Sequence, residues 1–137
     1  MTAAAASFCR ELSGQQKVEI DFRSDDIPKN LSQEISLCLF RVLQEALQNA
    51  AKHSGSKRFQ VMLSRTSNEI QLTVQDSGVG FDVEQALKSH GLGLTSMKER
   101  LKLVDGDLSI DAHVQVGTTI RATVSLNRGS KSDRASS

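Results

Sequence analysis

The chain reads KRFQVMLSRTSNEIQLTVQD over residues 57–76, and this stretch decides the fold. Apolar and polar side chains alternate with a period of two in each half, which is typical of a strand with one buried face. The apolar positions are Phe59, Val61 and Leu63 in the first half and Ile70, Leu72 and Val74 in the second. Thr66-Ser67-Asn68 separates the halves as a turn, so the stretch predicts a hairpin of strands over Lys57–Arg65 and Glu69–Gln75.

A long helix is expected immediately before the hairpin. Ser32 stands where an N-cap residue would, and the Ser54-Gly55-Ser56 breaker implies an end near Lys52. On a helical wheel of about 100° per residue one stripe is apolar. Its members are Ile35, Leu39, Val42, Ala46 and Ala50, with Glu45 and Asn49 along one edge.

Two shorter elements come before this helix. Residues 3–12 favour a helix that Ser13-Gly14-Gln15 should stop, because glycine is the commonest residue just past a helix end. Val18, Ile20 and Phe22 alternate with charged residues, which predicts a strand. Residues 24–30 hold the only proline and are expected to form a loop.

The C-terminal half continues the pattern. Residues 82–90 lack a strand pattern and are interpreted as a mobile lid, and helical spacing of apolar residues then predicts a helix over residues 94–104. Two strands follow, one around Leu108 and Ile110 and one over residues 120–126, with a turn at residues 115–117. Residues 127–137 are expected to be a disordered tail.

The order helix, strand, helix, strand, strand, helix, strand, strand predicts an α+β fold. Specifically, we expect a two-layer sandwich in which helices pack on one face of a mostly antiparallel, mixed sheet, since each strand offers one apolar face. A chain of 137 residues is long enough for one core. The expected division is 1–16 as a residual N-terminal helix or linker, 17–126 as the domain and 127–137 as the tail.

Composition excludes several functional classes. Seventeen Lys and Arg against sixteen Asp and Glu give a net charge of +1 without a block of like charge, so nucleic-acid binding and direct membrane contact are not expected. Cys9 and Cys38 are interpreted as small core residues in a reducing compartment, although a disulfide stays open. No apolar run approaches the roughly 20 residues of a bilayer span, and Ala3–Ala6 is too short for a signal peptide. A cytoplasmic location is therefore expected.

Glu45, Asn49 and Lys52 lie near one edge of the long helix. A carboxylate and an amide oxygen one turn apart suit a hard cation such as Mg²⁺ and its water, and Lys52 would meet a phosphate. Helices with such residues at solvated positions are common, so the alternative is that these three residues lie on a solvent-exposed helix face and have no function.

Asp76 follows a strand and opens the run Asp76-Ser77-Gly78-Val79-Gly80-Phe81. An ionised carboxylate only accepts hydrogen bonds, which suits the exocyclic amino group of adenine and rejects the carbonyl of guanine. The alternative is an Asx turn, to which Asp-Ser-Gly is well suited. Gly91-Leu92-Gly93-Leu94 directly before a helix would present N–H groups to phosphate oxygens.

Other common sites are missing from the sequence. It contains neither the phosphate-loop motif Gly-x-x-x-x-Gly-Lys-Ser/Thr nor the dinucleotide motif Gly-x-Gly-x-x-Gly. Its three histidines have no zinc-ligand spacing with the cysteines, and no Gly-x-Ser-x-Gly elbow is present.

Three motifs resemble the N box and the two glycine boxes of the GHKL ATP-binding superfamily. In order they are Glu45-x-x-x-Asn49-x-x-Lys52-His53, Asp76-x-Gly78-x-Gly80-Phe81 and Gly91-x-Gly93-Leu94. The run His90-Gly91-Leu92-Gly93-Leu94, with Met97 and Arg100 behind it, is most similar to sensor histidine kinases that signal to helix-turn-helix response regulators in bacterial two-component systems. The resemblance covers roughly residues 18–126.

The resemblance implies ATP and Mg²⁺ as cofactors and a role for each motif. Asn49 would bind Mg²⁺, Glu45 would orient water or assist catalysis, and Asp76 would recognise adenine. The other nucleotide-binding positions that it implies are Lys52, His53, Gly78, Gly80, Gly91, Leu92, Gly93, Leu94 and Thr118. Lys52 and His53 would face the phosphates and residues 91–94 would close over them, while Thr118 would hold a water beside Asp76.

The resemblance also implies a phosphoryl transfer whose acceptor lies elsewhere. The family's phosphoacceptor histidine has no match, since His53 belongs to the N box, His90 to the lid and His113 to a strand. Residues 17–126 would thus be a monomeric catalytic domain without autokinase activity of its own. Its partners would be the dimerisation domain of a parent kinase, for which a membrane anchor stays open, and a downstream response regulator.

Two other readings of the same motifs remain. A regulatory ATP-binding module, such as a relative of the anti-sigma-factor serine kinases, is the main alternative, and the signature from Met97 to Arg100 argues against it. A chaperone or topoisomerase ATPase would need appended transducer domains to supply a catalytic lysine.

Overall fold

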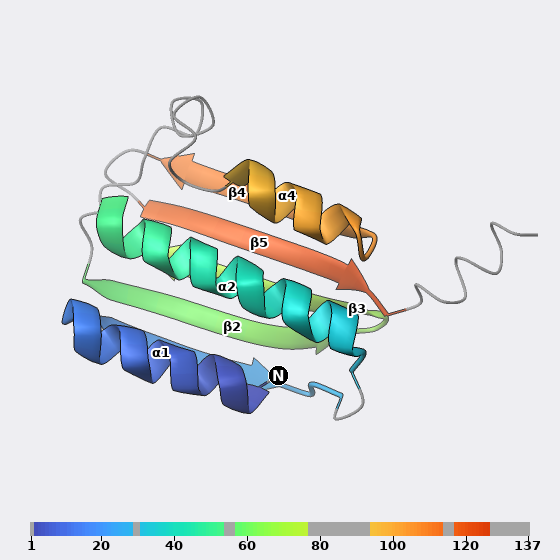
Figure 1. Ribbon diagram of the computed structural model, residues 1–137, viewed down its shortest axis with the longest axis horizontal. Helices are drawn as coiled ribbons and strands as arrows, with labels where there is room; N and C mark the ends of the chain where they lie inside the picture. The colour runs from blue at the N-terminus through green and yellow to red at the C-terminus, as the bar shows by residue number, and fades with distance from the viewer. Residues whose placement is uncertain (1, 29–30, 54–56, 77–93, 114–116, 127–137) are drawn as a thin grey trace, which may run out of the picture.

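The computed structural model describes residues 2–28, 31–53, 57–76, 94–113 and 117–126 (Figure 1). Its helices are α1 (Thr2–Gln16), α2 (Gln33–His53) and α4 (Leu94–Lys102). Its strands are β1 (Glu19–Asp25), β2 (Arg58–Thr66), β3 (Glu69–Asp76), β4 (Gly106–His113) and β5 (Gly117–Ser125). This order confirms the order expected from the sequence. The predicted lid, the turn over residues 115–116 and the predicted tail lie outside the described residues.

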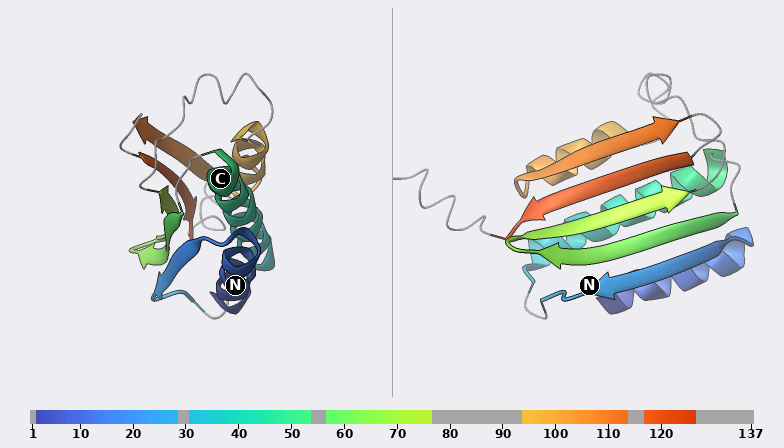
Figure 2. Two further views of the ribbon diagram at one scale, coloured as in Figure 1. Left: turned by 90° about the vertical axis from the view of Figure 1, so that its left-hand side faces the viewer. Right: turned by 180° about the vertical axis from the view of Figure 1, so that it is seen from behind.

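The strands form one five-stranded sheet in the order β1-β2-β3-β5-β4. β1 pairs with β2 in parallel, and the other three pairings are antiparallel, which confirms the mixed, mostly antiparallel sheet. The helices lie on one face, with α2 over β3 and β5, α1 beside β1 and α4 beside β4 (Figure 2). The α+β two-layer sandwich is therefore confirmed.

The core fills the space between the helices and the sheet. All six apolar hairpin residues and all five residues of the predicted α2 stripe are buried. The buried stripe of α2 is wider than predicted, because it also includes Cys38, Leu43 and Leu47. Both cysteines are buried and free, and burial raises the pKa of the Cys9 thiol to about 11. None of the described helices combines the length and the apolar character that crossing a bilayer requires.

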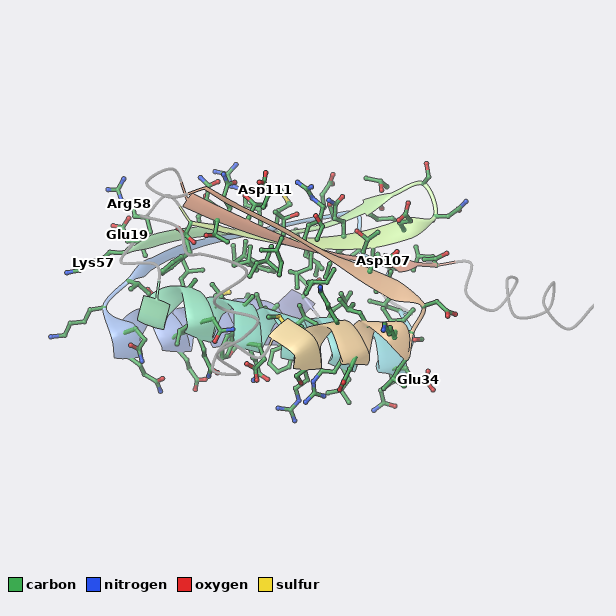
Figure 3. The ribbon with its side chains drawn as sticks, turned by 90° about the horizontal axis from the view of Figure 1, so that it is seen from above. Glu19, Glu34, Lys57, Arg58, Asp107 and Asp111 are labelled. Atoms are coloured by element: carbon green, nitrogen blue, oxygen red, sulfur yellow. The ribbon has the colours of Figure 1, made fainter. Side chains whose placement is uncertain are left out.

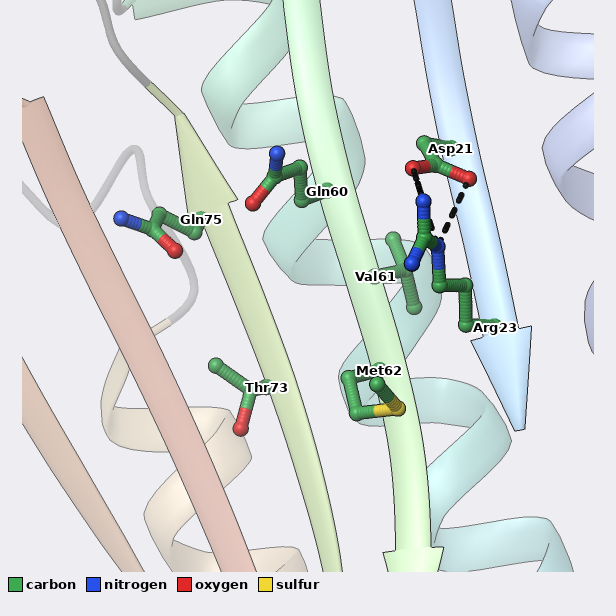
Figure 4. Close-up of a pocket in the computed structure, with 7 residues that line it drawn as sticks. All are labelled: Asp21, Arg23, Gln60, Val61, Met62, Thr73 and Gln75. Atoms are coloured by element: carbon green, nitrogen blue, oxygen red, sulfur yellow. Dashed lines mark hydrogen bonds and ion pairs between the residues drawn. The ribbon is translucent and has the colours of Figure 1, made fainter. Parts of the chain in front are cut away.

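The opposite face of the sheet is polar and exposed, as the alternation of the strands predicts (Figure 4). A shallow depression there is lined by Asp21, Arg23, Gln60, Val61, Met62, Thr73 and Gln75. Arg23 donates to the Asp21 carboxylate, with an N–O distance of 3.2 Å. Both side chains are at least half exposed, so this ion pair contributes little to stability.

Helix α1 ends later than the sequence predicted. It passes through Gly14 and runs to Gln16, so the prediction of a stop at residues 13–15 was wrong. Lys17 then takes a left-handed conformation with φ of 55°, and the Val18 amide donates to the Ser13 carbonyl at 3.2 Å. This pattern is that of a Schellman cap in which Lys17 occupies the position usually held by glycine.

Helix α1 also packs into the core rather than lying apart from it. Ala5, Cys9 and Leu12 are buried, and Phe8 makes an edge-to-face contact with Phe40 of α2, with ring centroids 5.9 Å apart. The helix thus contributes apolar area to the same core as the strands. The division of the chain at residue 17 stays a prediction.

The starts and ends of the other elements have local causes. The Ile35 amide donates to the Ser32 hydroxyl at 3.1 Å, which confirms Ser32 as the N-cap of α2. The β2–β3 hairpin turns at Ser67, whose φ is 46°. Helix α4 ends at Lys102, two residues before the predicted end, and the turn after it includes an amide–carbonyl bond from Val104 to Leu101 of 3.1 Å.

Two glycines should respond oppositely to replacement by alanine. A Cβ at Gly14, on an exposed position of α1, meets no atom within 4 Å. Gly14→Ala is therefore expected to stabilise the fold by about 0.5–1 kcal/mol, since alanine loses less backbone entropy in a helix. A Cβ at Gly106 would lie 2.9 Å from the carbonyl oxygen of Thr123 and 3.0 Å from a methyl of Leu101. Gly106→Ala should therefore destabilise by about 1–3 kcal/mol.

Urea unfolding of the two variants and the parent chain measures both effects, and each variant serves as the control for the other. A loss of stability in Gly14→Ala would show that α1 does not continue through Gly14 in solution.

Candidate functional site

Three segments that are distant in the sequence meet at one end of the sandwich. Helix α2 ends there, β3 ends there, and β5 begins there (Figure 1). The topology requires this, because β2 starts where α2 has finished, β3 returns antiparallel to β2, and β5 runs antiparallel to β3. This arrangement brings Asn49, Asp76 and Thr118 to the same end of the molecule.

The strand register places Asp76 beside Thr118. Directly opposite residues form a row across the sheet, which consists of Ile20, Phe59, Asp76, Thr118 and Ala112. Opposite residues in an antiparallel pair have Cβ atoms about 5 Å apart. Val74, two residues before Asp76, and Ile120, two residues after Thr118, are buried, so Asp76 and Thr118 share the helix-covered face of the sheet.

The same three residues are the buried polar side chains of the described part of the chain. Asn49 is 6% exposed, Asp76 is 4% exposed and Thr118 is 3% exposed. A core that is otherwise apolar thus concentrates its polar groups at one end, which is typical of a binding site.

Thr118 gives the most direct indication of a ligand. Its hydroxyl oxygen Oγ1 is buried and has no hydrogen-bond partner among the described residues. Such an unmatched hydroxyl costs about 1–3 kcal/mol, and a water or a polar ligand atom beside Asp76 would remove that cost. The pair therefore fits the donor-and-acceptor edge of a nucleotide base.

Thr118 is positioned by the backbone at the start of β5. Gly117 is buried and has a φ of 132°, a conformation that side chains with a Cβ rarely adopt. The glycine thus lets β5 begin at this point, with Thr118 opposite Asp76.

The predicted N-box residues lie on the last two turns of α2. Glu45 is half-buried and precedes the buried Asn49 by four residues, which is about 6 Å along the helix axis. Asn49 is thus not at a solvated helix position, which was the alternative for this trio. Lys52 and His53 belong to the final turn of α2, and only their backbone is described.

The glycine boxes are only partly described. Leu94 is the first residue of α4. The other predicted positions, Gly78, Gly80, Gly91, Leu92 and Gly93, lie outside the described residues. Within the described part, no group of three or more His, Cys, Asp or Glu side chains gathers as a metal site.

One neighbour of the site was not predicted. Phe59 on β2 stands directly opposite Asp76 on the side away from Thr118, and it is only 2% exposed. It forms an apolar wall beside the carboxylate. The predicted three-residue turn over residues 66–68 would have set Phe59 opposite Gln75. That turn was one residue too long, because Thr66 belongs to β2 and pairs with Glu69, and this register sets Phe59 opposite Asp76.

The chain belongs to the family of histidine kinase-, DNA gyrase B- and HSP90-like ATPases, whose model matches residues 34–128. Within that family it is a catalytic ATP-binding domain of the histidine-kinase type. This confirms the resemblance deduced from the three motifs, and the regulatory alternative is not favoured.

Two curated relatives support the histidine-kinase branch. One is the signal transduction histidine-protein kinase/phosphatase DegS of Bacillus subtilis, which is 34% identical over 119 residues, or 85% of this chain and 31% of DegS. The other is the oxygen sensor histidine kinase NreB of Staphylococcus carnosus, which is 32% identical over 126 residues, or 92% of this chain and 36% of NreB. The chain thus spans about a third of the length of either relative.

Solved structures share the fold. The histidine kinase domain of the Erythrobacter litoralis EL346 blue-light activated kinase superposes with a TM-score of 0.78 at 18% identity, covering 93% of this chain and 65% of that one. The catalytic domain of the histidine kinase ThkA superposes with a TM-score of 0.67 at 16% identity, covering 90% of this chain and 88% of that one.

Proposed function

We propose that the chain binds Mg²⁺-ATP at the end of the sandwich where α2, β3 and β5 meet. The observation that carries the proposal is the convergence of Asn49, Asp76 and Thr118, buried at this one end of an otherwise apolar core. The adenine ring would lie at the Asp76–Thr118 pair and the phosphates would lie toward the end of α2. Residues 78–80 and 91–94 would complete the pocket.

Asp76 would accept a hydrogen bond from the exocyclic amino group of adenine. Thr118 Oγ1 would hold a water or contact the base directly, which would satisfy a hydroxyl that has no partner among the described residues. Phe59, buried beside Asp76, would keep bulk water away from the carboxylate and so strengthen its hydrogen bond.

Asn49 would ligate Mg²⁺ through its amide oxygen, with the ATP phosphates and waters supplying the other ligands. Mg²⁺ usually takes only one or two ligands from a protein and keeps several waters, so one amide with a nearby carboxylate suits it. Glu45, one turn earlier, would orient a coordinated water or assist catalysis. Lys52 and His53 would face the phosphates from the last turn of α2.

The reaction would be transfer of the γ-phosphoryl group to a histidine on a dimerisation domain outside this chain, and from there to a response regulator. The domain itself would supply positioning and charge neutralisation, which is the general pattern of phosphoryl transfer. This chain alone would be monomeric and would hydrolyse ATP slowly or not at all.

Calorimetric titration tests the site. The chain is titrated with ADP and with a non-hydrolysable ATP analogue, with and without Mg²⁺, and with GTP as the comparison. We expect binding that is selective for adenine and strengthened by Mg²⁺. Failure of a demonstrably folded chain to bind any of these nucleotides would refute the proposed site.

Asn49→Ala is expected to remove the increase in ATP affinity that Mg²⁺ produces and to leave Mg²⁺-free ADP binding nearly unchanged. A ligand contact to a charged group is worth about 1.5–3 kcal/mol, which corresponds to at least about tenfold in affinity. Gln48→Ala is the matched control, since Gln48 is an exposed amide side chain on the same turn. Equal Mg²⁺ dependence in Asn49→Ala and the parent chain would remove Asn49 from the metal site.

A further inference from the structure

A groove opens on the helical layer at the other end of the molecule. Its volume is about 470 Å³, and it lies between the first turns of α2 and the end of α4. The lining residues are Glu34, Leu37 and Cys38 from α2 and Arg100, Leu103 and Val104 from α4 and the turn after it. The groove thus has α2 as one wall and α4 with the turn after it as the other, and four of its six lining residues are apolar.

Two leucines in this groove are exposed. Leu37 is 56% exposed and Leu103 is 76% exposed, and Met62 on the outer face of the sheet, at 39%, completes the large exposed apolar side chains of the described residues. Single exposed apolar residues are normal on soluble proteins, but these two line one groove together with the apolar Cys38 and Val104. Exposed apolar patches commonly mark interaction surfaces.

The groove is separate from the candidate nucleotide site. Glu34 and Asn49 are both on α2 and differ by fifteen residues, which is about 22 Å along the helix axis. Figure 3 places Glu34 at the end of the molecule opposite Lys57 and Arg58, and Arg58 is the first residue of β2. A ligand in the groove would therefore not touch the nucleotide.

The two charged residues that line the groove are Arg100 on the α4 side and Glu34 on the α2 side. Lys98 and Lys102 are further exposed basic residues of α4, outside the lining of the groove. Arg100 lines the groove and stands close enough to Cys38 for its charge to oppose the rise in the pKa of that thiol caused by burial. An occupant with acidic side chains toward α4 would thus complement the charge of Arg100 and keep those side chains away from Glu34, because complementary potentials favour association.

We propose that this groove docks an amphipathic α-helix of a separate partner protein, with its apolar face on Leu37 and Leu103 and an acidic edge toward Arg100. Grooves between two helices accept a third helix whose apolar residues recur every three or four positions. Burial of the two leucines supplies the affinity, and Arg100 on one wall with Glu34 on the other fixes the orientation of the bound helix.

The test uses two designed peptides of about 18 residues, long enough for a marginal helix. Both carry leucines at helical three-and-four spacing, but one has glutamates along one edge of the leucine stripe and the other has lysines at those positions. Fluorescence anisotropy at low salt measures their affinity for the full chain. We expect the glutamate peptide to bind at least about tenfold more tightly, and Arg100→Glu to reverse this preference.

Substitutions on the groove map the binding. The double variant Leu37→Ser, Leu103→Ser should lose at least about tenfold in affinity, whereas Met62→Ser, an equivalent change on the outer face of the sheet, should lose none. Both leucines are exposed, so the double variant should remain folded and should bind ADP like the parent chain. That nucleotide readout separates a failure of the groove from a failure of the nucleotide site.

Three results would overturn the proposal. The first is equal affinity for the two peptides, and the second is binding that is unaffected by the double variant. The third is self-association of the parent chain in sedimentation that the double variant abolishes, because a second copy would then be the occupant of the groove.

Discussion

Asp76→Asn is expected to weaken ADP binding by about 10- to 100-fold and to remove most of the preference for adenine over guanine nucleotides. Asp76 is buried at the end of β3 between Phe59 and Thr118, where water does not compete for its hydrogen bonds. A hydrogen bond to a charged group is worth about 1.5–3 kcal/mol, and each 1.4 kcal/mol is about tenfold. The neutral amide of asparagine also presents a donor, which the carbonyl of guanine accepts.

Calorimetric titration of the variant and the parent chain with ADP and GDP measures both effects. Asp107→Asn is the matched control, because Asp107 is an exposed carboxylate on β4 at the other end of the sheet (Figure 3). Asparagine has nearly the shape of aspartate, so the thermal unfolding curve should confirm that the fold is intact. A parent chain that binds ADP and GDP equally would contradict the proposed role of Asp76 in reading the base.

Leu43→Ala should have the largest effect on stability, with an expected loss of about 2–5 kcal/mol in the free energy of unfolding. Leu43 is fully buried in the middle of α2, where the helix contacts β3 and β5. Removing its side chain loses transfer free energy and leaves a cavity that close-packed neighbours fill only partly. Domains of this size have total stabilities of about 5–15 kcal/mol, so this loss is a large share.

Leu37, on the same helix, provides the control for the effect of Leu43→Ala on stability. Leu37→Ala makes the same chemical change at a position that is 56% exposed, and it should alter stability by less than about 0.5 kcal/mol. Urea unfolding at constant pH gives both values, with unchanged slopes if the transition stays two-state. Equal losses in the two variants would show that α2 does not pack on the sheet with the face described.

Much of the fold follows from residues that are close in the sequence. Alternation in residues 57–76 predicted the hairpin, and Ser32 as N-cap predicted the start of α2. The end of α1 was missed for a specific reason. Glycine usually follows a helix, but Gly14 lies within α1, and the left-handed residue that ends it is Lys17. Whether a cap forms at Gly14 or at Lys17 depends on where the apolar Val18 can be buried, and that is a tertiary contact.

The residues of the candidate site also divide into those that local sequence patterns identify and those that they do not. Glu45 and Asn49 could be identified from their spacing on one helix, and Asp76 from its place at a strand end before two glycines. Phe59 was missed, because the predicted three-residue turn pairs it with Gln75, whereas the two-residue turn of the structure sets it opposite Asp76. Thr118 came only from the family resemblance, because no local pattern distinguishes it from the threonines around it.

By itself, the sequence determined the type and order of the elements that the structure describes, the apolar face of most of them, and the family to which the chain belongs. These properties depend on side-chain periodicity and on short motifs, which act over a few residues. Only the tertiary structure decided that β5 lies between β3 and β4, because strand order is set by how the strands together cover the helices. That order brings Thr118 beside Asp76 and buries both near the end of α2. The tertiary structure also brings the exposed Leu37 and Leu103 to one groove, although they are more than sixty positions apart in the chain.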